Sequence, residues 1–203
     1  MSVRIVGRSS SHFTRTVRMF AHECTVAYEF QPLFDLMSQS PADYAGNPAL
    51  KLPVLESGGG AWFGALNICR ELARCASGPL RIVWPEDLRE RLAANAQELV
   101  LQGMASEVVL IMSGNDAAAY GDKARTSMLN SLAWLDAQLP GVLRSLPAER
   151  SLSFLEISSF CFFTHLEFRS IADTSSYANL RAFCQAYGNR SSARDTTYRF
   201  DQP

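Results

Sequence analysis

The order of apolar patterns at the start of the chain constrains the fold more than any other feature of the sequence. The run from Val3 to Val6 is short and rich in β-branched residues, which favours a strand. A Ser-rich turn separates it from a helical pattern whose apolar residues, from Phe13 to Cys24, share one face. A second apolar run, from Val26 to Phe30, follows. We therefore predict the order strand, helix, strand.

A hairpin and a second helix complete this first part of the chain. The segments Pro53 to Glu56 and Ala61 to Phe63 have the character of short strands, and three consecutive glycines between them, Gly58 to Gly60, suit a tight turn. Apolar residues from Ile68 to Cys75 then recur at helical spacing. The order βαβ followed by ββα predicts a small mixed sheet flanked by helices.

The remainder of the chain is predicted to be mainly helical. Long helical patterns run from Asp87 to Met112 and from Asp122 to Leu139, and we expect these two helices to pack as an antiparallel pair. Ser153 and Glu156 have the spacing of a capping box in front of an apolar helix. One more helix is expected from Tyr177 to Tyr187.

Turn residues at both ends of the segment Ser77 to Pro85 mark the boundary between these two parts. We therefore predict a first domain at residues 1–76, a linker at 77–85 and a helical domain at 86–203. A chain of 203 residues is long enough for each part to bury its own apolar core.

Composition and charge exclude several classes of partner. The formal charge of −1 gives no general attraction to nucleic acid or to anionic lipid. The first residues lack the apolar run of a signal peptide, and later apolar runs are too short to cross a bilayer, so we expect a cytoplasmic protein. The five cysteines include no Cys-x-x-Cys pair, which favours buried free thiols and gives no reason to expect a metal site.

Four segments in the right order resemble the glutathione transferase superfamily, in particular its bacterial members. Ser11 to Arg18 is similar to the family's Ser-Pro-Tyr/Phe-x-x-x-Val-Arg, and Asn47 to Leu55 is similar to its Asn-Pro-x-Gly-Lys-Val-Pro-Val-Leu. Ile68 to Leu72 and Tyr177 to Phe183 resemble two further family segments. The resemblance implies a thioredoxin-like α/β domain that binds glutathione, an all-α C-terminal domain and a homodimer.

A transferase of this kind must ionise the glutathione thiol. An ordinary thiol pKa near ~8.5 leaves about 3% thiolate at neutral pH, and lowering that pKa by about two units requires ~2.7 kcal/mol of preferential stabilisation of the anion. The resemblance assigns the catalytic hydroxyl to Ser11, in front of the first helix. Ser9 and Ser10 are alternatives for this role, and Ser10 or Ser11 could instead simply cap the helix.

The same resemblance places further glutathione contacts. Pro53 is expected to follow a cis peptide bond, so that the backbone of Leu52 pairs with the cysteinyl part of glutathione. Lys51 could reach a ligand carboxylate, although a surface lysine is the simpler interpretation. Phe13, beside the expected catalytic serine, completes this set.

One departure from the family pattern affects the glutathione site directly. Most members carry an acidic residue followed by Ser where this chain has Gly64 and Ala65. Only the backbone amide of Ala65 is then left to meet the γ-glutamyl carboxylate. Each hydrogen bond lost to a charged group is worth roughly 1.5 to 3 kcal/mol, so affinity would fall by about 10- to 100-fold per contact.

These observations support two main functional hypotheses. In the first, glutathione activated by Ser11 is conjugated to a small apolar electrophile, whose pocket is assigned to Met104, Val108 and Tyr120. In the second, the chain is a non-catalytic module of the same fold that binds an apolar ligand or a protein and has lost glutathione binding. A thiol exchange enzyme is a third hypothesis, and its nearest cysteine, Cys24, lies about three to four helical turns beyond the expected site.

Overall fold

The structure is a computed structural model that describes residues 3–112 and 118–203, without the side chains of 118–120. The chain divides into two compact units. Unit 1 contains the chain up to Leu80 together with Asn189–Pro203, and unit 2 contains Arg81–Gly188. Each unit is described separately below.

Unit 1 is built on a four-stranded sheet. Its strands are β1 (Val3–Gly7), β2 (Glu29–Pro32), β3 (Val54–Ser57) and β4 (Gly60–Phe63), in the order β2-β1-β3-β4. β1 pairs with β2 in parallel and with β3 antiparallel, and β3 and β4 form an antiparallel hairpin. The predicted small mixed sheet is confirmed.

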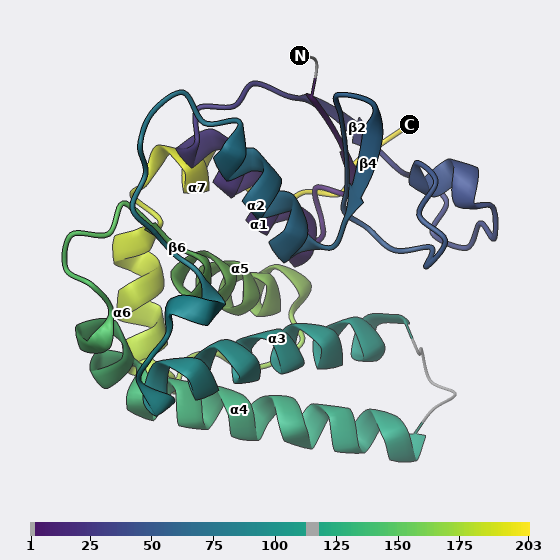
Figure 1. Cartoon of the computed structure of the whole chain (residues 1–203). Helices are drawn as coiled ribbons and strands as arrows, with labels where there is room; N and C mark the ends of the chain where they lie inside the picture. Colours follow the sequence, from purple (N-terminus) through teal and green to yellow (C-terminus); the bar gives the residue numbers. More distant parts are fainter. Residues whose placement is uncertain (1–2, 113–117) are drawn as a thin grey trace. The chain divides into compact units, whose positions relative to one another are not determined.

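Two helices pack against one another beside this sheet (Figure 1). They are α1 (His12–Glu23) and α2 (Ala65–Arg74). Their apolar faces form the core of unit 1, where Val17, Phe20, Ile68 and Leu72 are all fully buried beside Ile5 of β1. A fully buried Val, Leu, Ile or Phe side chain contributes about 1.5 to 3 kcal/mol, so burial of these helix faces stabilises unit 1.

The second strand begins later than the apolar run predicts. Thr25 adopts a left-handed conformation with φ 56°, and the amide of Val26 donates to the carbonyl of Ala21 at 2.9 Å. This hydrogen bond belongs to the turn that ends α1, so the first residues of the run are used to stop the helix. β2 therefore starts at Glu29.

The helices of unit 2 are α3 (Arg91–Met112), α4 (Ala118–Ser145), α5 (Phe154–Arg169) and α6 (Ala178–Tyr187). α3 and α4 lie side by side and antiparallel, as predicted (Figure 1). α5 is the most apolar of the four, and Phe154, Phe162 and Phe163 are almost completely buried. Ser153 caps α5 by accepting from the amide of Glu156, whereas the Glu156 carboxylate accepts two hydrogen bonds of 2.7 Å from Arg150.

The expected linker at 77–85 is partly wrong. Ile82–Val83 forms a short strand, β5, which pairs in parallel with β6 (Leu152–Ser153) inside unit 2. A 3-10 turn at Pro85–Asp87 precedes α3. A strand of two residues is too short to show a periodic pattern, so it cannot be predicted from its own sequence. It forms because it pairs with residues about 70 positions further along the chain.

The C-terminal boundary also differs from the expected helical domain at 86–203. Residues 189–203, here called the tail, belong to unit 1 and carry a short helix, α7 (Ser191–Asp195). Contacts of Arg15, His22 and Glu23 tie the tail to α1. The tail is thus part of the unit that carries the predicted glutathione site.

Two further expectations concern the cysteines and the membrane. Cys24, Cys69, Cys161 and Cys184 are buried free thiols as predicted, but Cys75 is exposed. Burial raises the pKa of the Cys24 thiol to about 12, which makes it a poor nucleophile at neutral pH. Among the described residues, none of the helices has the length and apolarity needed to span a bilayer.

Candidate functional site

The register of the sheet brings three separate segments to one of its ends. Val6 lies opposite Val54, and Val54 lies opposite Phe63. The turn that leaves β1, the loop that enters β3 and the start of α2 after β4 therefore meet at the same end. These segments contain the predicted Ser11, Leu52–Pro53 and Gly64–Ala65.

The turn between β1 and α1 holds Ser11 at the start of the helix. The Ser11 hydroxyl accepts a hydrogen bond from the amide of Thr14 at 3.3 Å, which makes it the N-cap of α1. Accepting this bond leaves the hydroxyl proton able to donate to a thiolate. Capping and thiol activation are therefore compatible roles for this one side chain.

Gly7 was not identified from the sequence, but the turn depends on it. A Cβ atom at this position would lie 2.5 Å from the Cγ2 atom of Thr14. The Thr14 hydroxyl in turn accepts from the amide of Arg8 at 3.3 Å. Any larger residue at position 7 would push the first turn of α1 away from the strand.

The structure weakens one of the two alternative serines. Ser9 is only 2% exposed, and its hydroxyl accepts a hydrogen bond from Nη1 of Arg18 at 3.3 Å. Its backbone amide donates to the Asp201 carboxylate at 2.7 Å. Ser10 and Ser11 are both half-buried. Ser9 is thus a structural residue of the turn, and the catalytic assignment to Ser11 stays a prediction.

The loop in front of β3 is stabilised by Asn47. The expected cis peptide bond between Leu52 and Pro53 is present. Asn47 is buried, with 4% of its surface exposed. Its side chain donates a hydrogen bond to the Lys51 carbonyl at 2.7 Å and accepts one from the Ala49 amide at 3.0 Å. These two hydrogen bonds fix the backbone immediately before Leu52. Asn47 begins the segment up to Leu55 that resembles the family, but the sequence alone indicates no role for its side chain.

The start of α2 has glycine where the resemblance predicts an acidic residue. Gly64 is the N-cap of α2 and adopts φ 83° and ψ 134°, a conformation that residues with a Cβ rarely adopt. No side-chain atom caps this helix end. Glycine suits this backbone conformation and offers no side-chain hydrogen-bonding group at this position.

The remaining predicted site residues are placed as follows. Phe13 is half-buried at the start of α1, and Lys51 is exposed. His12, next to Ser11 in the sequence, is only 2% exposed. In unit 2, Met104 is 1% exposed and Val108 is 38% exposed, while the side chain of Tyr120 lies outside the described residues. Because Met104 is buried, its side chain packs in the core of unit 2. The assignment of these three residues to a substrate pocket stays a prediction.

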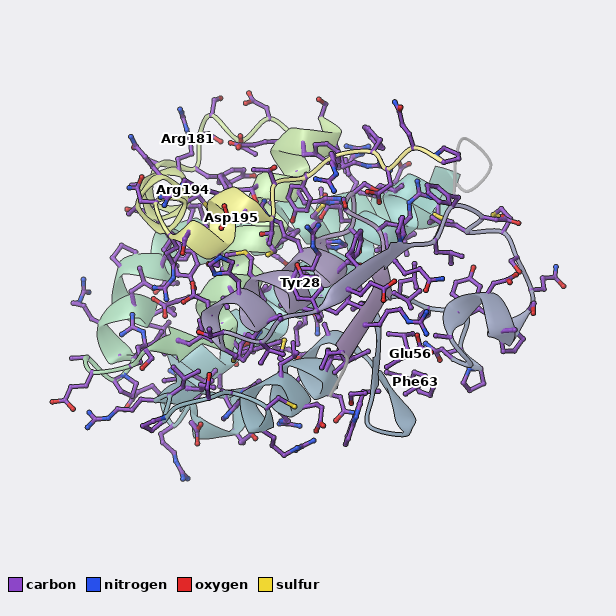
Figure 2. The ribbon with its side chains drawn as sticks, turned by 90° about the horizontal axis from the view of Figure 1, so that it is seen from above. Tyr28, Glu56, Phe63, Arg181, Arg194 and Asp195 are labelled. Carbon is purple, nitrogen blue, oxygen red and sulfur yellow. The ribbon has the colours of Figure 1, made fainter. Side chains whose placement is uncertain are left out.

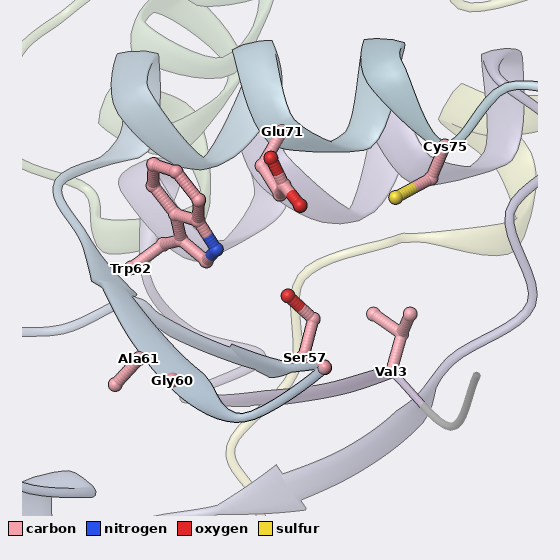
Figure 3. A pocket seen from close by; sticks show the side chains of 8 residues that line it. Val3, Ser57, Gly60, Ala61, Trp62, Glu71 and Cys75 are labelled. Atoms are coloured by element: carbon pink, nitrogen blue, oxygen red, sulfur yellow. The ribbon is translucent and has the colours of Figure 1, made fainter.

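A pocket of about 420 Å³ lies at the opposite end of the sheet. Val3, Ser57 and Gly60 line it together with Trp62, Glu71 and Cys75 (Figure 3). Val3 pairs with Ser57, and Ser57 with Gly60, at the far ends of their strands. This pocket is therefore separate from the end of the sheet where Ser11 lies.

Comparison with known proteins identifies the fold of this architecture. Residues 10–75 match the family described as "Glutathione S-transferase, N-terminal domain". The chain is similar over 98% of its length, and over 100% of the other chain, to a glutathione S-transferase of Methylobacillus flagellatus solved with glutathione bound, with a TM-score of 0.78 and 20% identity. This is the glutathione S-transferase fold.

Two other solved structures have the same fold. A glutathione transferase family member of Pseudomonas fluorescens Pf-5, with bound glutathione, is 20% identical at a TM-score of 0.77 over 98% of this chain and 100% of the other. A glutathione S-transferase of Methylobacterium radiotolerans, in complex with glutathione sulfonate, is 18% identical, with a TM-score of 0.74. The similarity covers 100% of this chain and 98% of the other. No protein with a curated description matches the chain. The predicted thioredoxin-like and helical parts of the fold are confirmed, and residues 10–75 match the N-terminal domain of the predicted superfamily.

Proposed function

We propose that unit 1 binds glutathione and that Ser11 stabilises its thiolate for conjugation to a small apolar electrophile. The observation that supports this most is the convergence of the Ser11 turn, the Leu52–Pro53 loop and the start of α2 at one end of the sheet. α1 and α2 both begin there, and helix N-termini present free amides and partial positive charge to an anion.

The proposed reaction needs only glutathione and the electrophile. The thiol proton passes to solvent, and the Ser11 hydroxyl donates a hydrogen bond to the sulfur anion that remains. The sulfur electron pair then forms a bond to an electrophilic carbon. A leaving group departs with the electrons of its broken bond, or, in an addition, the adjacent atom takes up a proton. The amide and carbonyl of Leu52 would orient the cysteinyl part of the tripeptide.

The start of α2 is the part of the proposed site that would bind glutathione most weakly. Gly64 and Ala65 offer backbone amides to the γ-glutamyl carboxylate but no side-chain donor. Restoring both residues of the family pattern would strain the backbone, because Gly64 has a positive φ. Ala65→Ser alone adds a hydroxyl at the first helical position without that strain.

The test is calorimetric titration of reduced glutathione into the full chain and into Ala65→Ser. We expect saturable binding by both proteins, with affinity increased by about 10- to 100-fold in the variant. Asn67→Ser, on the exposed side of the same helix, is the matched control and should leave affinity unchanged. Absence of binding to the unmodified chain and to Ala65→Ser would contradict the proposal.

A second test concerns the catalytic role of Ser11. Ser11→Gly removes the hydroxyl but keeps a residue that suits an N-cap, so the fold is retained. We expect conjugation of a model aryl halide, measured as kcat/KM, to be lost in this variant while S-methylglutathione still binds. Full activity in Ser11→Gly would reject Ser11 as the catalytic hydroxyl.

The alternative function is a non-catalytic binding module, and the bare start of α2 favours it. In that case glutathione binding would be absent in the unmodified chain and would appear only in Ala65→Ser. Val108, a half-exposed apolar residue of α3, is a proposed contact for an apolar ligand under either function. A buried Met104 would then support the pocket from within the core.

Assembly and location follow from the same proposal. We propose a homodimer in the cytoplasm, as the resemblance to the superfamily implies. Light scattering over a range of concentrations measures the mass directly. A mass near twice 22.4 kDa supports the dimer, and a constant monomer mass contradicts it.

A further inference from the structure

The side chain of Asp201 reaches from the tail to the turn that carries Ser11. Its Oδ2 atom accepts a hydrogen bond of 2.7 Å from the backbone amide of Ser9, across 192 residues of sequence. The Asp201 side chain is only 6% exposed. A buried carboxylate with an amide donor at this distance forms a charge-assisted hydrogen bond, which is roughly twice as strong as a neutral one.

Ser9 is held on its other side by the first helix. Its hydroxyl accepts from Nη1 of Arg18, whose Nε donates to the Tyr28 hydroxyl at 3.1 Å. The Arg18 guanidinium also lies 4.5 Å from the centre of the Phe30 ring. Ser9 is thus fixed at both its amide and its hydroxyl, two residues before Ser11.

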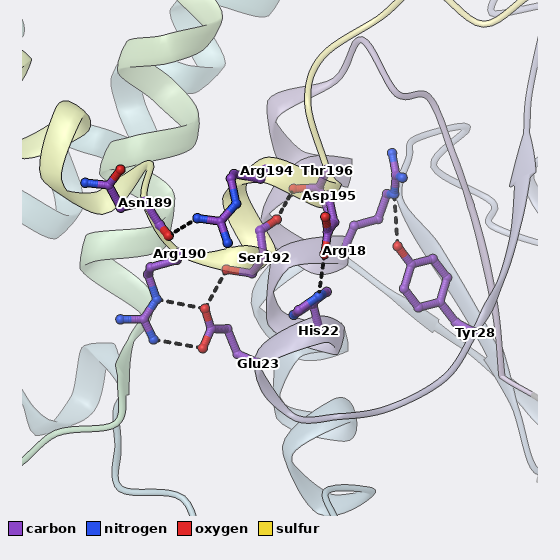
Figure 4. Close-up of polar contacts among 10 residues, drawn as sticks. All are labelled: Arg18, His22, Glu23, Tyr28, Asn189, Arg190, Ser192, Arg194, Asp195 and Thr196. Carbon is purple, nitrogen blue, oxygen red and sulfur yellow. Dashed lines mark hydrogen bonds and ion pairs between the residues drawn. The ribbon is translucent and has the colours of Figure 1, made fainter.

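The tail that delivers Asp201 is firmly attached to α1 (Figure 4). Arg190 donates to both carboxylate oxygens of Glu23, at 2.7 and 2.8 Å. Asp195 lies 2.9 Å from Nε2 of His22. Figure 2 shows Asp195 and Tyr28 from above.

Arg15 of α1 anchors the middle of the tail. Its Nη2 donates to the Ala193 carbonyl at 3.1 Å, and its guanidinium lies 4.3 Å from the centre of the Tyr198 ring. Arg15 is 5% exposed, so these contacts are made inside the unit. The path of the tail from Arg190 to Asp201 is therefore fixed over its length rather than at its end alone.

We propose that Asp201 is a positioning residue, which holds the Ser9–Ser11 turn so that the Ser11 hydroxyl points at the glutathione sulfur. This inference rests on the proposed function. Without the Asp201 oxygen, the Ser9 amide loses its partner and the turn gains freedom, so Ser11 spends less time in donating geometry. The pKa of bound glutathione's thiol then rises toward its value in free solution.

The hydrogen bond and the charge of Asp201 act in opposite directions on that thiol. A negative carboxylate disfavours a thiolate, whereas an ordered turn favours it. Nε of Arg199 lies 3.8 Å from Oδ1 of Asp201 and offsets part of that charge. Asp201→Asn keeps an oxygen that can accept from the Ser9 amide and removes the charge. This variant should therefore leave the thiol pKa unchanged or lower it, while Asp201→Ala raises it.

The experiment measures thiolate formation rather than turnover. Glutathione bound to the full chain is titrated with pH, and the thiolate is followed by its ultraviolet absorbance. We expect a thiol pKa below ~8.5 in the unmodified protein, and a rise of about one unit or more in Asp201→Ala. Asp201→Glu, which keeps the charge but displaces the oxygen, should show a smaller rise.

A matched control comes from the same tail. Asp195→Ala removes another tail carboxylate, one whose side chain is 62% exposed and contacts His22 rather than the turn. It should leave the thiol pKa unchanged. S-methylglutathione, which has no ionisable thiol, should bind to all variants with similar affinity. Circular dichroism checks that each variant is folded, and Asp201→Glu retains a residue of similar size and charge if the alanine variant does not fold.

The outcomes separate the inference from the proposed function. A lowered thiol pKa in the unmodified protein that is unchanged in Asp201→Ala and Asp201→Glu would overturn the positioning role alone. A merely structural role would lower the melting temperature of these variants without moving the thiol pKa. If the unmodified protein binds neither glutathione nor S-methylglutathione, the proposed function fails and this inference falls with it.

Discussion

At the scale of single residues, backbone geometry decides which side chains the candidate site can use. Leu50 has a positive φ of 53° at the position where the resembled family segment has glycine. At position 64 the relation is reversed, because this chain has glycine where most family members have an acidic residue. The loop at Leu50 is held in place by Asn47, whose side chain bridges two backbone groups. Buried side chains that satisfy the backbone in this way are costly to remove.

Asn47→Ala should lower the free energy of unfolding by about 1 to 3 kcal/mol, because it leaves the Ala49 amide and the Lys51 carbonyl without this partner. Urea denaturation measures the change. Asn67→Ala, at an exposed position in α2, is the control and should change stability by less than about 0.5 kcal/mol. Equal stability of the two variants would show that Asn47 does not hold the loop.

At the scale of secondary-structure elements, the helix starts carry both stability and chemistry. Ser11 caps α1 and Ser153 caps α5, each by accepting an amide hydrogen bond three residues on. Both residues immediately precede a helix, so the hydroxyl satisfies an amide that has no partner inside the helix. The capping contact of Ser11 therefore predicts a contribution to stability.

Ser11→Ala should destabilise the protein by about 1 kcal/mol, whereas Ser11→Gly should cost only a few tenths of a kcal/mol. The difference arises because glycine tolerates the N-cap backbone and exposes the helix amides to water. Thermal unfolding of the two variants measures it. Identical melting temperatures for the unmodified protein and Ser11→Ala would mean that the 3.3 Å contact to Thr14 has no stabilising effect.

At the scale of the whole molecule, the chain leaves unit 1 after Leu80, builds unit 2 and returns to unit 1 at Asn189. Charged side chains make several of the contacts that attach the returning tail. Glu23 is central, because Arg190 and Ser192 both donate to its carboxylate. Burial raises the pKa of Glu23, but the hydrogen bonds from Arg190 and Ser192 lower it by more, so the pKa lies below its ordinary value.

This depressed pKa predicts a pH dependence for tail attachment. The unfolded chain protonates Glu23 at a higher pH than the folded chain, so the stability that Glu23 contributes is present above about pH 4.3 and is lost as pH falls through the folded-state pKa. Glu23→Gln should cost about 1 kcal/mol at neutral pH, and the difference from the unmodified protein should shrink on acidification.

Urea denaturation at a series of pH values tests this dependence. Glu29→Gln, which changes an exposed carboxylate of β2 in the same unit, is the control. A stability difference for Glu23→Gln that stays constant across the acid range would contradict the role given to the Arg190 contact.

The sequence by itself determined the elements whose signals are local. The helical faces around Phe20 and Leu72 and the Gly58–Gly60 turn were predicted because periodicity and turn chemistry act within a few residues. The resemblance segments added the cis bond before Pro53. The approximate position of each of these elements could therefore be predicted, but the residues at which it begins and ends could not.

Only the tertiary structure decided what depends on distant partners. Two-residue β5 exists because it pairs with β6, and the tail joins unit 1 because Arg15 and Glu23 bind it. The contact between Asp201 and Ser9 spans almost the whole chain, and neither residue carries a local pattern that points to the other. These hydrogen bonds and ion pairs depend on which distant segments the fold brings together, and no local pattern specifies that, so they could not be predicted from the sequence.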